Sequence, residues 1–168
     1  MNMGQKMTID NHEKLIRLLG ETLEEANAEM WPYVDLTSQT IETHFDSDLT
    51  DIDEYEEIGG HKIVDIRPVS SPEAFSVMER FALSRPENEL QRLLRVLSRR
   101  HPFKAFHSEV EYLGIIQEWY DFKSKSYYEL AEERLDDYDI DIVDGKIVCS
   151  TPENIKTVTH KKDEDYDI

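Results

Sequence analysis

The stretch that decides the fold class is residues 62–82, KIVDIRPVSSPEAFSVMERFA. Its first part, residues 62–67, alternates between two sets of side chains, and this period of two predicts a strand. Pro68 ends the strand, because proline has no backbone N–H to donate to a β-ladder. From Ser70 onward the apolar residues recur at helical spacing. One short segment therefore changes from strand to helix, which indicates a fold that contains both.

Further strands are predicted on both sides of this stretch. Two segments flank the polar turn Thr37–Ser38–Gln39, which is typical of a β-hairpin. We expect the strand at 62–67 to join this hairpin in one antiparallel sheet. The dipeptide Asp144–Gly145 is a turn signal for another hairpin. The five predicted strands are residues 33–36, 41–45, 62–67, 140–142 and 147–149.

Five helices are predicted from start signals and apolar spacing. Asp10 with Glu13 is typical of a capping box at the start of the first helix. The apolar face predicted for this helix consists of His12, Ile16, Leu19, Leu23 and Ala26. The other four helices are predicted to start at Ser70 or Ser71, at Pro86, at Pro102 and at Ile115, the last running to about Leu135. We expect an α+β fold in which three to five helices pack on a small antiparallel sheet of three strands plus the C-terminal hairpin.

The length and the charge of the chain limit its organisation. A chain of 168 residues predicts a single domain, placed at residues 1–151, and the sparse apolar content that follows predicts a disordered polar tail at residues 152–168. The 19 Lys and Arg residues stand against 37 Asp and Glu residues, a net charge of −18. A chain this acidic is repelled by DNA, RNA and anionic membranes unless it carries a local basic patch.

The charge is distributed unevenly along the chain. Residues 1–60 carry a net charge of −12, residues 61–127 carry +2, and residues 128–168 carry −8. Either the acidic ends neutralise the weakly basic middle, or the middle meets an anion from outside the chain.

The sequence predicts a cytoplasmic protein. No apolar leader follows Lys6, and no stretch approaches the roughly 20 apolar residues of a membrane helix. Cys149 is the single cysteine, so neither an intrachain disulfide nor a cysteine-based zinc site can form.

Several motifs in the middle of the chain occur together in one known family. They are a Tyr-x-Asp-Leu strand, an Ile-x-Pro-Val strand end, a Met-x-x-Phe helix, a Phe-x-x-Phe turn and a Trp-Tyr-x-Phe helix. The residues that carry them are Tyr33, Asp35, Leu36, Ile66, Pro68, Val69, Met78, Phe81, Phe103, Phe106, Trp119, Tyr120 and Phe122. Over about residues 33–135 the chain resembles an uncharacterised bacterial protein family, family zero-one-five-eight of the UPF series. The resemblance implies no catalytic residues.

Most of these motif residues are large and apolar, which is typical of a protein core. We expect Phe103, Phe106, Trp119 and Phe122 to form one buried aromatic cluster.

Signals for metal binding and catalysis are weak. The acidic segment at residues 46–57 resembles a calcium loop in its carboxylates, but Asp51 stands where such a loop needs glycine. No metal-binding spacing, glycine-rich phosphate loop or nucleophile elbow is present. The histidines that could converge on a metal, or serve as a base, are His44, His61, His101 and His107. We predict no metal, no cofactor and no catalytic residue.

The most interpretable surface is one side of the helix that follows Pro86. At 100° per residue, Arg92, Arg95 and Arg99 fall within about 60° of one another. Two interpretations stay open: a solvated face, or a surface that binds an anion through guanidinium forks. The candidate partners that would neutralise a solvated face are Glu129, Glu132 and Asp136. The arginine stripe, which we take as the candidate binding site, consists of Arg92, Arg95, Arg99, Arg100 and Lys104.

Three classes of function follow. We expect a noncatalytic binding or regulatory module whose partner is an unidentified protein or another anion. The first alternative is an enzyme with a hydrolytic or transfer site near His101 and His107. The second is an acidic mimic of nucleic acid. We expect no membrane partner, and nucleic acid only through the arginine stripe.

Overall fold

A computed structural model describes residues 8–45 and 60–159. These residues form an α+β fold, which confirms the predicted fold class. The chain divides into two compact units: unit 1 comprises residues 1–68 and 128–168, and unit 2 comprises residues 69–127. Unit 2 is inserted in the sequence of unit 1, and the single domain expected at residues 1–151 stays a prediction.

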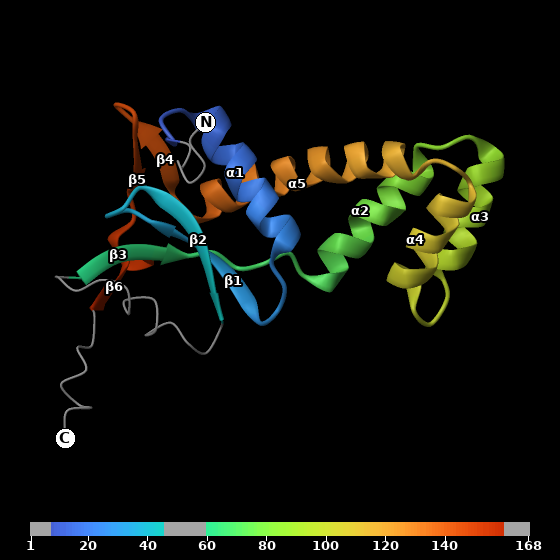
Figure 1. The fold of residues 1–168 in the computed structure, drawn as a ribbon, viewed down its shortest axis with the longest axis horizontal. Helices are drawn as coiled ribbons and strands as arrows, with labels where there is room; N and C mark the ends of the chain where they lie inside the picture. The colour runs from blue at the N-terminus through green and yellow to red at the C-terminus, as the bar shows by residue number, and fades with distance from the viewer. Residues whose placement is uncertain (1–7, 46–59, 160–168) are drawn as a thin grey trace, which may run out of the picture. The chain divides into compact units, whose positions relative to one another are not determined.

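Unit 1 is built around a four-stranded antiparallel sheet with the strand order β2-β1-β3-β6 (Figure 1). Strands β1 (Met30–Asp35) and β2 (Thr40–Phe45) form the predicted hairpin. Strand β3 (Gly60–Asp65) pairs with the other edge of β1, as expected for the strand at 62–67. The sequence signals for these three strands are thus confirmed.

The fourth strand, β6 (Lys156–Thr159), falls where a disordered tail was expected. It pairs antiparallel with β3, and Val158 is buried against Tyr33 and Ile63. A short 3-10 helix, η2 (Pro152–Asn154), leads into it. The prediction of disorder is therefore wrong for residues 152–159. The backbone hydrogen bonds to β3 stabilise this segment, whose own apolar content is too low to do so. Residues 160–168 lie outside the described part of the chain.

The predicted second hairpin is present as β4 (Ile140–Val143) and β5 (Lys146–Cys149). Asp144 and Gly145 have φ angles of 53° and 76°. Positive φ at both central residues is what a type I′ turn needs, and its twist matches that of the two strands.

Helix α1 (His12–Glu25) packs on β1, β2 and β4. Its cap is Asn11 rather than Asp10: the Asn11 side chain accepts a hydrogen bond from Lys14 N at 2.9 Å. The expected apolar face is rotated as well, since His12 is exposed. The buried residues of α1 are Leu15, Leu19, Gly20 and Leu23.

Unit 2 contains α2 (Ser71–Leu83), α3 (Glu87–Leu97), α4 (Pro102–Tyr112) and the first part of α5 (Ile116–Tyr138). Of the two predicted starts for α2, the capping box of Ser70 with Glu73 is the one that forms, and Pro72 lies in the first turn. The four helices begin within about a residue of their predicted starts, and α5 runs on to Tyr138.

The core of unit 2 is aromatic, but it lacks one of the expected members. Phe81 and Phe106 are buried, and their ring centroids lie 5.3 Å and 4.9 Å from the centroid of Trp119. Phe122 is half-buried and packs on Phe81 at 5.3 Å. Phe103 is 44% exposed, so its expected burial is wrong. It occupies the second residue of α4, one turn from Phe106 but directed out of the core.

The second half of α5 belongs to unit 1 and is held by a buried arginine. Arg134 is fully buried; its Nε donates to the carbonyl of Arg67 at 3.0 Å and its Nη2 to the carbonyl of Pro68 at 2.9 Å. These bonds join the end of the sheet strand to the returning helix within unit 1. No helix in the described ranges 8–45 and 60–159 has the length and apolarity that a bilayer crossing requires.

Candidate functional site

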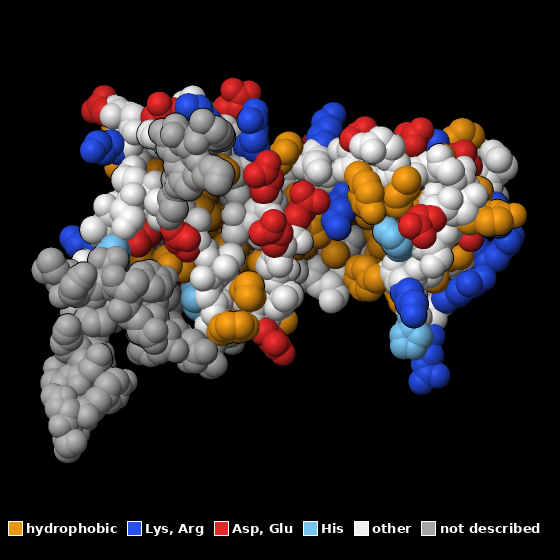
Figure 2. Space-filling view, in the orientation of Figure 1, with side chains coloured by type: hydrophobic (Ala, Val, Ile, Leu, Met, Phe, Trp, Pro, Cys, Tyr) orange, Lys and Arg blue, Asp and Glu red, His pale blue; other side chains and the backbone are white. Residues whose placement is uncertain are grey.

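Two members of the arginine stripe, Arg92 and Arg95, lie on the solvent side of α3 because the opposite side supplies the core. Leu93, Val96 and Leu97 are buried, and they hold the helix with Arg92 and Arg95 outward. Arg99 and Arg100 follow in the connection to α4, and Lys104 lies in the first turn of α4. All five cationic side chains are exposed. Figure 2 shows Lys and Arg side chains gathered over α3 and α4.

Four of the five candidate residues line one groove between α3 and α4, with a volume of about 670 Å³. Arg95 is exposed on α3 but does not line the groove. The residues of this basic groove are Arg92, Arg99, Arg100, His101, Lys104, Ala105, Ser108, Glu109 and Tyr112.

The Arg92 side chain is held in place in the basic groove by two residues of α4, Glu109 and Tyr112. Its Nε donates to Glu109 Oε2 at 2.6 Å, and its guanidinium lies 5.0 Å from the ring centroid of Tyr112. The hydrogen bond to Glu109 raises the pKa of the Arg92 guanidinium above its ordinary value. The partner of Arg92 is thus on α4, and not among the carboxylates Glu129, Glu132 and Asp136 that a neutralised stripe was expected to use.

The other stripe residues carry uncompensated charge within the described part of the chain. Arg95, Arg99, Arg100 and Lys104 form no ion pair with any described carboxylate. Glu132, one of the expected neutralising residues, lies 4.0 Å from His12. The groove therefore presents several cations and one internally paired arginine.

The four candidate histidines do not converge. His101 lines the basic groove, whereas His107 lines a different cavity of unit 2. His44 and His61 lie on the sheet of unit 1. Among residues 8–45 and 60–159, no three His, Cys, Asp or Glu side chains are grouped so as to hold a metal ion. The calcium-loop segment at residues 46–57 is outside the described residues.

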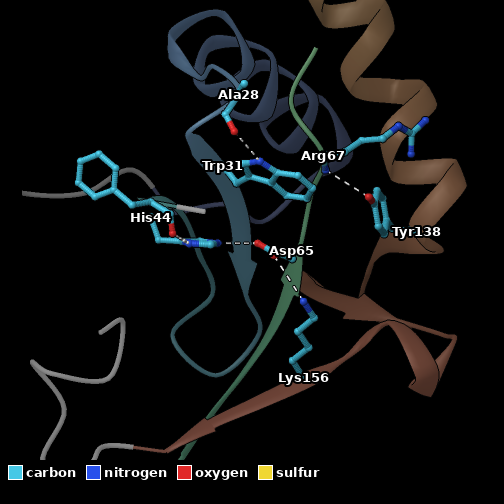
Figure 3. Close-up of polar contacts among 8 residues, drawn as sticks. Ala28, Trp31, His44, Asp65, Arg67, Tyr138 and Lys156 are labelled. Atoms are coloured by element: carbon cyan, nitrogen blue, oxygen red, sulfur yellow. Dashed lines mark hydrogen bonds and ion pairs between the residues drawn. The ribbon is translucent and has the colours of Figure 1, made fainter. Parts of the chain in front are cut away.

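His44 and Asp65 form a polar cluster on the sheet that the sequence did not indicate. His44 of β2 reaches over β1 to Asp65 of β3, with an Nε2–Oδ1 distance of 2.7 Å (Figure 3). His44 Nδ1 lies 2.6 Å from the carbonyl of Phe45, and Lys156 Nζ lies 3.5 Å from Asp65 Oδ2. Both ring nitrogens of His44 thus lie within hydrogen-bond distance of an oxygen atom. No short motif records such a cluster, because its members come from three strands.

A second histidine–aspartate pair has the residue types of a catalytic triad but not its geometry. His61 Nδ1 lies 2.7 Å from Asp35 Oδ2 and 3.4 Å from Ser38 Oγ. A relay needs the carboxylate and the nucleophile on different ring nitrogens. Here both meet the same nitrogen, and Asp35 Oδ1 accepts from the backbone of Thr37 and Ser38. The pair therefore fastens the β1–β2 turn.

Comparison with known proteins supports the family resemblance. The chain is similar to the curated UPF0158 protein PA5073 of Pseudomonas aeruginosa, with 35% identity over 77 residues. The chain resembles the uncharacterised UPF0158-type proteins. The resemblance predicted from the motifs is thereby confirmed. The match covers 45% of this chain and 50% of the Pseudomonas protein, so the chain spans about half the length of this UPF0158 relative. No protein-family model and no solved structure matches the sequence.

Proposed function

We propose that this chain is a noncatalytic binding module that holds an acidic segment of a partner protein in its basic groove. The observation that carries the proposal is the lining of that groove, where Arg92, Arg99, Arg100 and Lys104 come together from two helices and their connection.

The distribution of charge between the units supports this proposal. Residues 69–127 carry 9 basic and 8 acidic residues, whereas the rest of the chain carries 10 basic and 29 acidic residues. The basic groove belongs to the unit with a net charge of +1, and the remaining sequence carries −19. A local positive field in an acidic protein steers anionic partners toward one surface.

The chemistry of the lining suits carboxylates held at fixed positions. Guanidinium groups present two parallel N–H donors, which match the two oxygens of a carboxylate. Glu109 already binds Arg92 in this part of the groove at 2.6 Å, so the protein itself provides one carboxylate–guanidinium contact there. Arg99, Arg100 and Lys104 leave equivalent donors for carboxylates of a partner.

A protein segment is favoured over nucleic acid because of the chain's total charge. A long polyanion that entered the groove would also meet the field of a chain whose net charge is −18. A short acidic segment can be confined to the groove. Its contacts lie within the roughly 8 Å over which charges act at physiological salt.

Binding is favoured over catalysis because the two histidines of the enzyme alternative line different cavities. That alternative needs His101 and His107 at one substrate. The acidic-mimic alternative would use the carboxylates of unit 1 instead of the basic groove. It predicts a cationic partner, so the two hypotheses differ in the sign of the ligand.

A direct test measures binding of a labelled oligoglutamate peptide by fluorescence anisotropy at low and at physiological salt. We expect saturable binding that weakens as salt is raised, because exposed charges are screened. The double variant Arg99→Glu/Arg100→Glu should abolish it. The matched control is Arg17→Glu/Lys125→Glu, which makes the same change in charge at two exposed positions outside the groove and should bind like the parent.

Three outcomes would contradict the proposal. Equal binding by the groove variant and the control would place the contact elsewhere. Tighter binding of a single-stranded RNA of equal charge would favour nucleic acid as the partner. Binding of neither anion by the folded parent would leave the stripe a solvated face.

A further inference from the structure

A second cavity of unit 2 lies between α2, α4 and α5. It shares no lining residue with the basic groove. Its volume is about 190 Å³. The residues of this aromatic pocket are Ala74, Val77, Met78, Phe103, Phe106, His107, Trp119, Lys123 and Tyr127.

The walls of the aromatic pocket are apolar and fixed. Val77, Phe106 and Trp119 are all buried, and the rings of Phe106 and Trp119 meet edge to face at 73° with centroids 4.9 Å apart. Such ring pairs leave edges and faces to which a further aromatic ring can pack in the same geometry. An apolar cavity of roughly 150 Å³ is large enough for benzene. The aromatic pocket therefore has room for one six-membered ring with a small substituent.

The burial and the position of Lys123 at the mouth of the pocket indicate the charge of that substituent. Lys123 lines the pocket, is half-buried, and makes no ion pair with any described carboxylate. Its Nζ lies 5.7 Å from the ring centroid of Tyr127, so the ammonium is held over the pocket wall. A half-buried cation beside an apolar cavity favours a ligand that carries an anion next to an apolar body.

The other charged groups at the mouth favour a single negative charge. His107 Nε2 lies 3.6 Å from Glu111 Oε2, which brings a carboxylate close to one side of the opening. A second negative charge on the ligand would meet Glu111, whereas one charge can be placed at Lys123. Phe103, whose exposure of 44% departs from the expected core, lines this pocket, and a ring in the pocket would cover part of it.

We propose that the aromatic pocket binds a small aromatic monocarboxylate, with the ring against Phe106 and Trp119 and the carboxylate at Lys123. The binding is separate from the basic groove, so either proposal can fail alone.

The experiment is a titration of the full chain with benzoate, followed by two-dimensional NMR of the tryptophan indole N–H groups. The chain has two tryptophans, and only Trp119 lines the pocket. We expect the Trp119 resonance to move and to saturate while that of Trp31 stays in place. Lys123→Gln should weaken benzoate binding about tenfold, since it keeps the stem and removes the charge. Lys125→Gln, an exposed lysine of the same helix, should bind like the parent.

Two further arms test the position of the ligand. Benzyl alcohol has the ring without the charge, and we expect it to bind the parent and Lys123→Gln equally. Ala74→Leu narrows the pocket from the α2 side. It should abolish benzoate binding while the NMR spectrum remains that of a folded protein. The proposal is overturned if benzoate leaves Trp119 unmoved, if Lys123→Gln binds benzoate as tightly as the parent, or if Ala74→Leu has no effect.

Discussion

The side-chain amide of Gln39 pairs with the backbone of Ile147 as a strand would. Its Nε2 donates to the Ile147 carbonyl at 3.0 Å, and its Oε1 accepts from the Ile147 N–H at 2.7 Å. Gln39 lies in the β1–β2 turn with a φ of 62°, and Ile147 lies in β5. One side chain thus connects the four-stranded sheet to the two-stranded hairpin within unit 1.

We predict that Gln39→Leu destabilises unit 1 by about 1–3 kcal/mol, because it leaves the Ile147 N–H and carbonyl without their partner. Urea unfolding followed by the NMR signal of the Trp31 indole N–H reports on this unit, because the other tryptophan, Trp119, lies in unit 2. The matched control is Gln117→Leu, which removes an exposed glutamine bonded to Asp121 and should change stability by about 0.5 kcal/mol or less. Equal midpoints for Gln39→Leu and the parent would contradict the role of the amide.

Trp119→Ala should destabilise unit 2 by about 3–5 kcal/mol, because it removes a buried ring from the aromatic core. Phe103→Ala is the matched comparison, since Phe103 is 44% exposed, and we expect a loss of about 1 kcal/mol or less. Circular dichroism during urea unfolding measures both. The assignment of the core would be wrong if the two variants lost similar stability.

Val158→Ala should destabilise unit 1 by about 1–2 kcal/mol, because two methyl groups leave the contact with Tyr33 and Ile63. Thr157→Ala alters the exposed neighbour in the same strand and should stay within about 0.5 kcal/mol of the parent. Thermal unfolding measures the melting temperatures of both variants. Equal melting temperatures for Val158→Ala and Thr157→Ala would show that β6 contributes no stability.

Arg134→Met should cost on the order of 2–5 kcal/mol, because the carbonyls of Arg67 and Pro68 lose charged donors inside the protein. Arg134→Lys should recover only part of this, since an ammonium cannot reproduce the two donors of the guanidinium fork. Arg17→Met, at an exposed position of α1, serves as the control. A stability of Arg134→Met equal to that of the parent would show that the apolar replacement is tolerated at this site.

Short sequence motifs correctly predicted the start of α2 and the turn between β4 and β5. The capping box at Ser70 and the turn at Asp144–Gly145 involve residues within three positions of each other, so the sequence alone specifies them. The outward direction of Arg92 and Arg95 on α3 follows from the helical period in the same way, whereas Arg99 lies beyond the end of this helix. The basic groove does not follow from it, because the groove needs Lys104 and Tyr112 of α4 to pack beside Arg92.

The errors at β6 and at Phe103 come from contacts between segments that are distant in the sequence. β6 has one buried apolar residue, Val158. Its sequence alone is mostly polar, and it forms a strand because it pairs with β3. A signal was available in the alternation of Thr157, Val158 and Thr159, which are β-branched residues typical of strands. Phe103 and Phe106 have equal apolar character in one motif, and only the direction of α4 separates the exposed ring from the buried one.

The insertion of unit 2 within unit 1 also sets the order in which the chain can acquire its structure during synthesis. Strands β1, β2 and β3 emerge from the ribosome before residues 69–127, whereas β6 is made after them. Gly60 and Thr159 are partners in the sheet, so this pairing must close a loop that contains the whole inserted unit. Helices α2, α3 and α4 form local contacts that close early, and closures over long separations are slow. The last strand of the described sheet is therefore added after the inserted helices exist, and the edge of β3 that pairs with β6 stays unpaired while residues 66–155 are made.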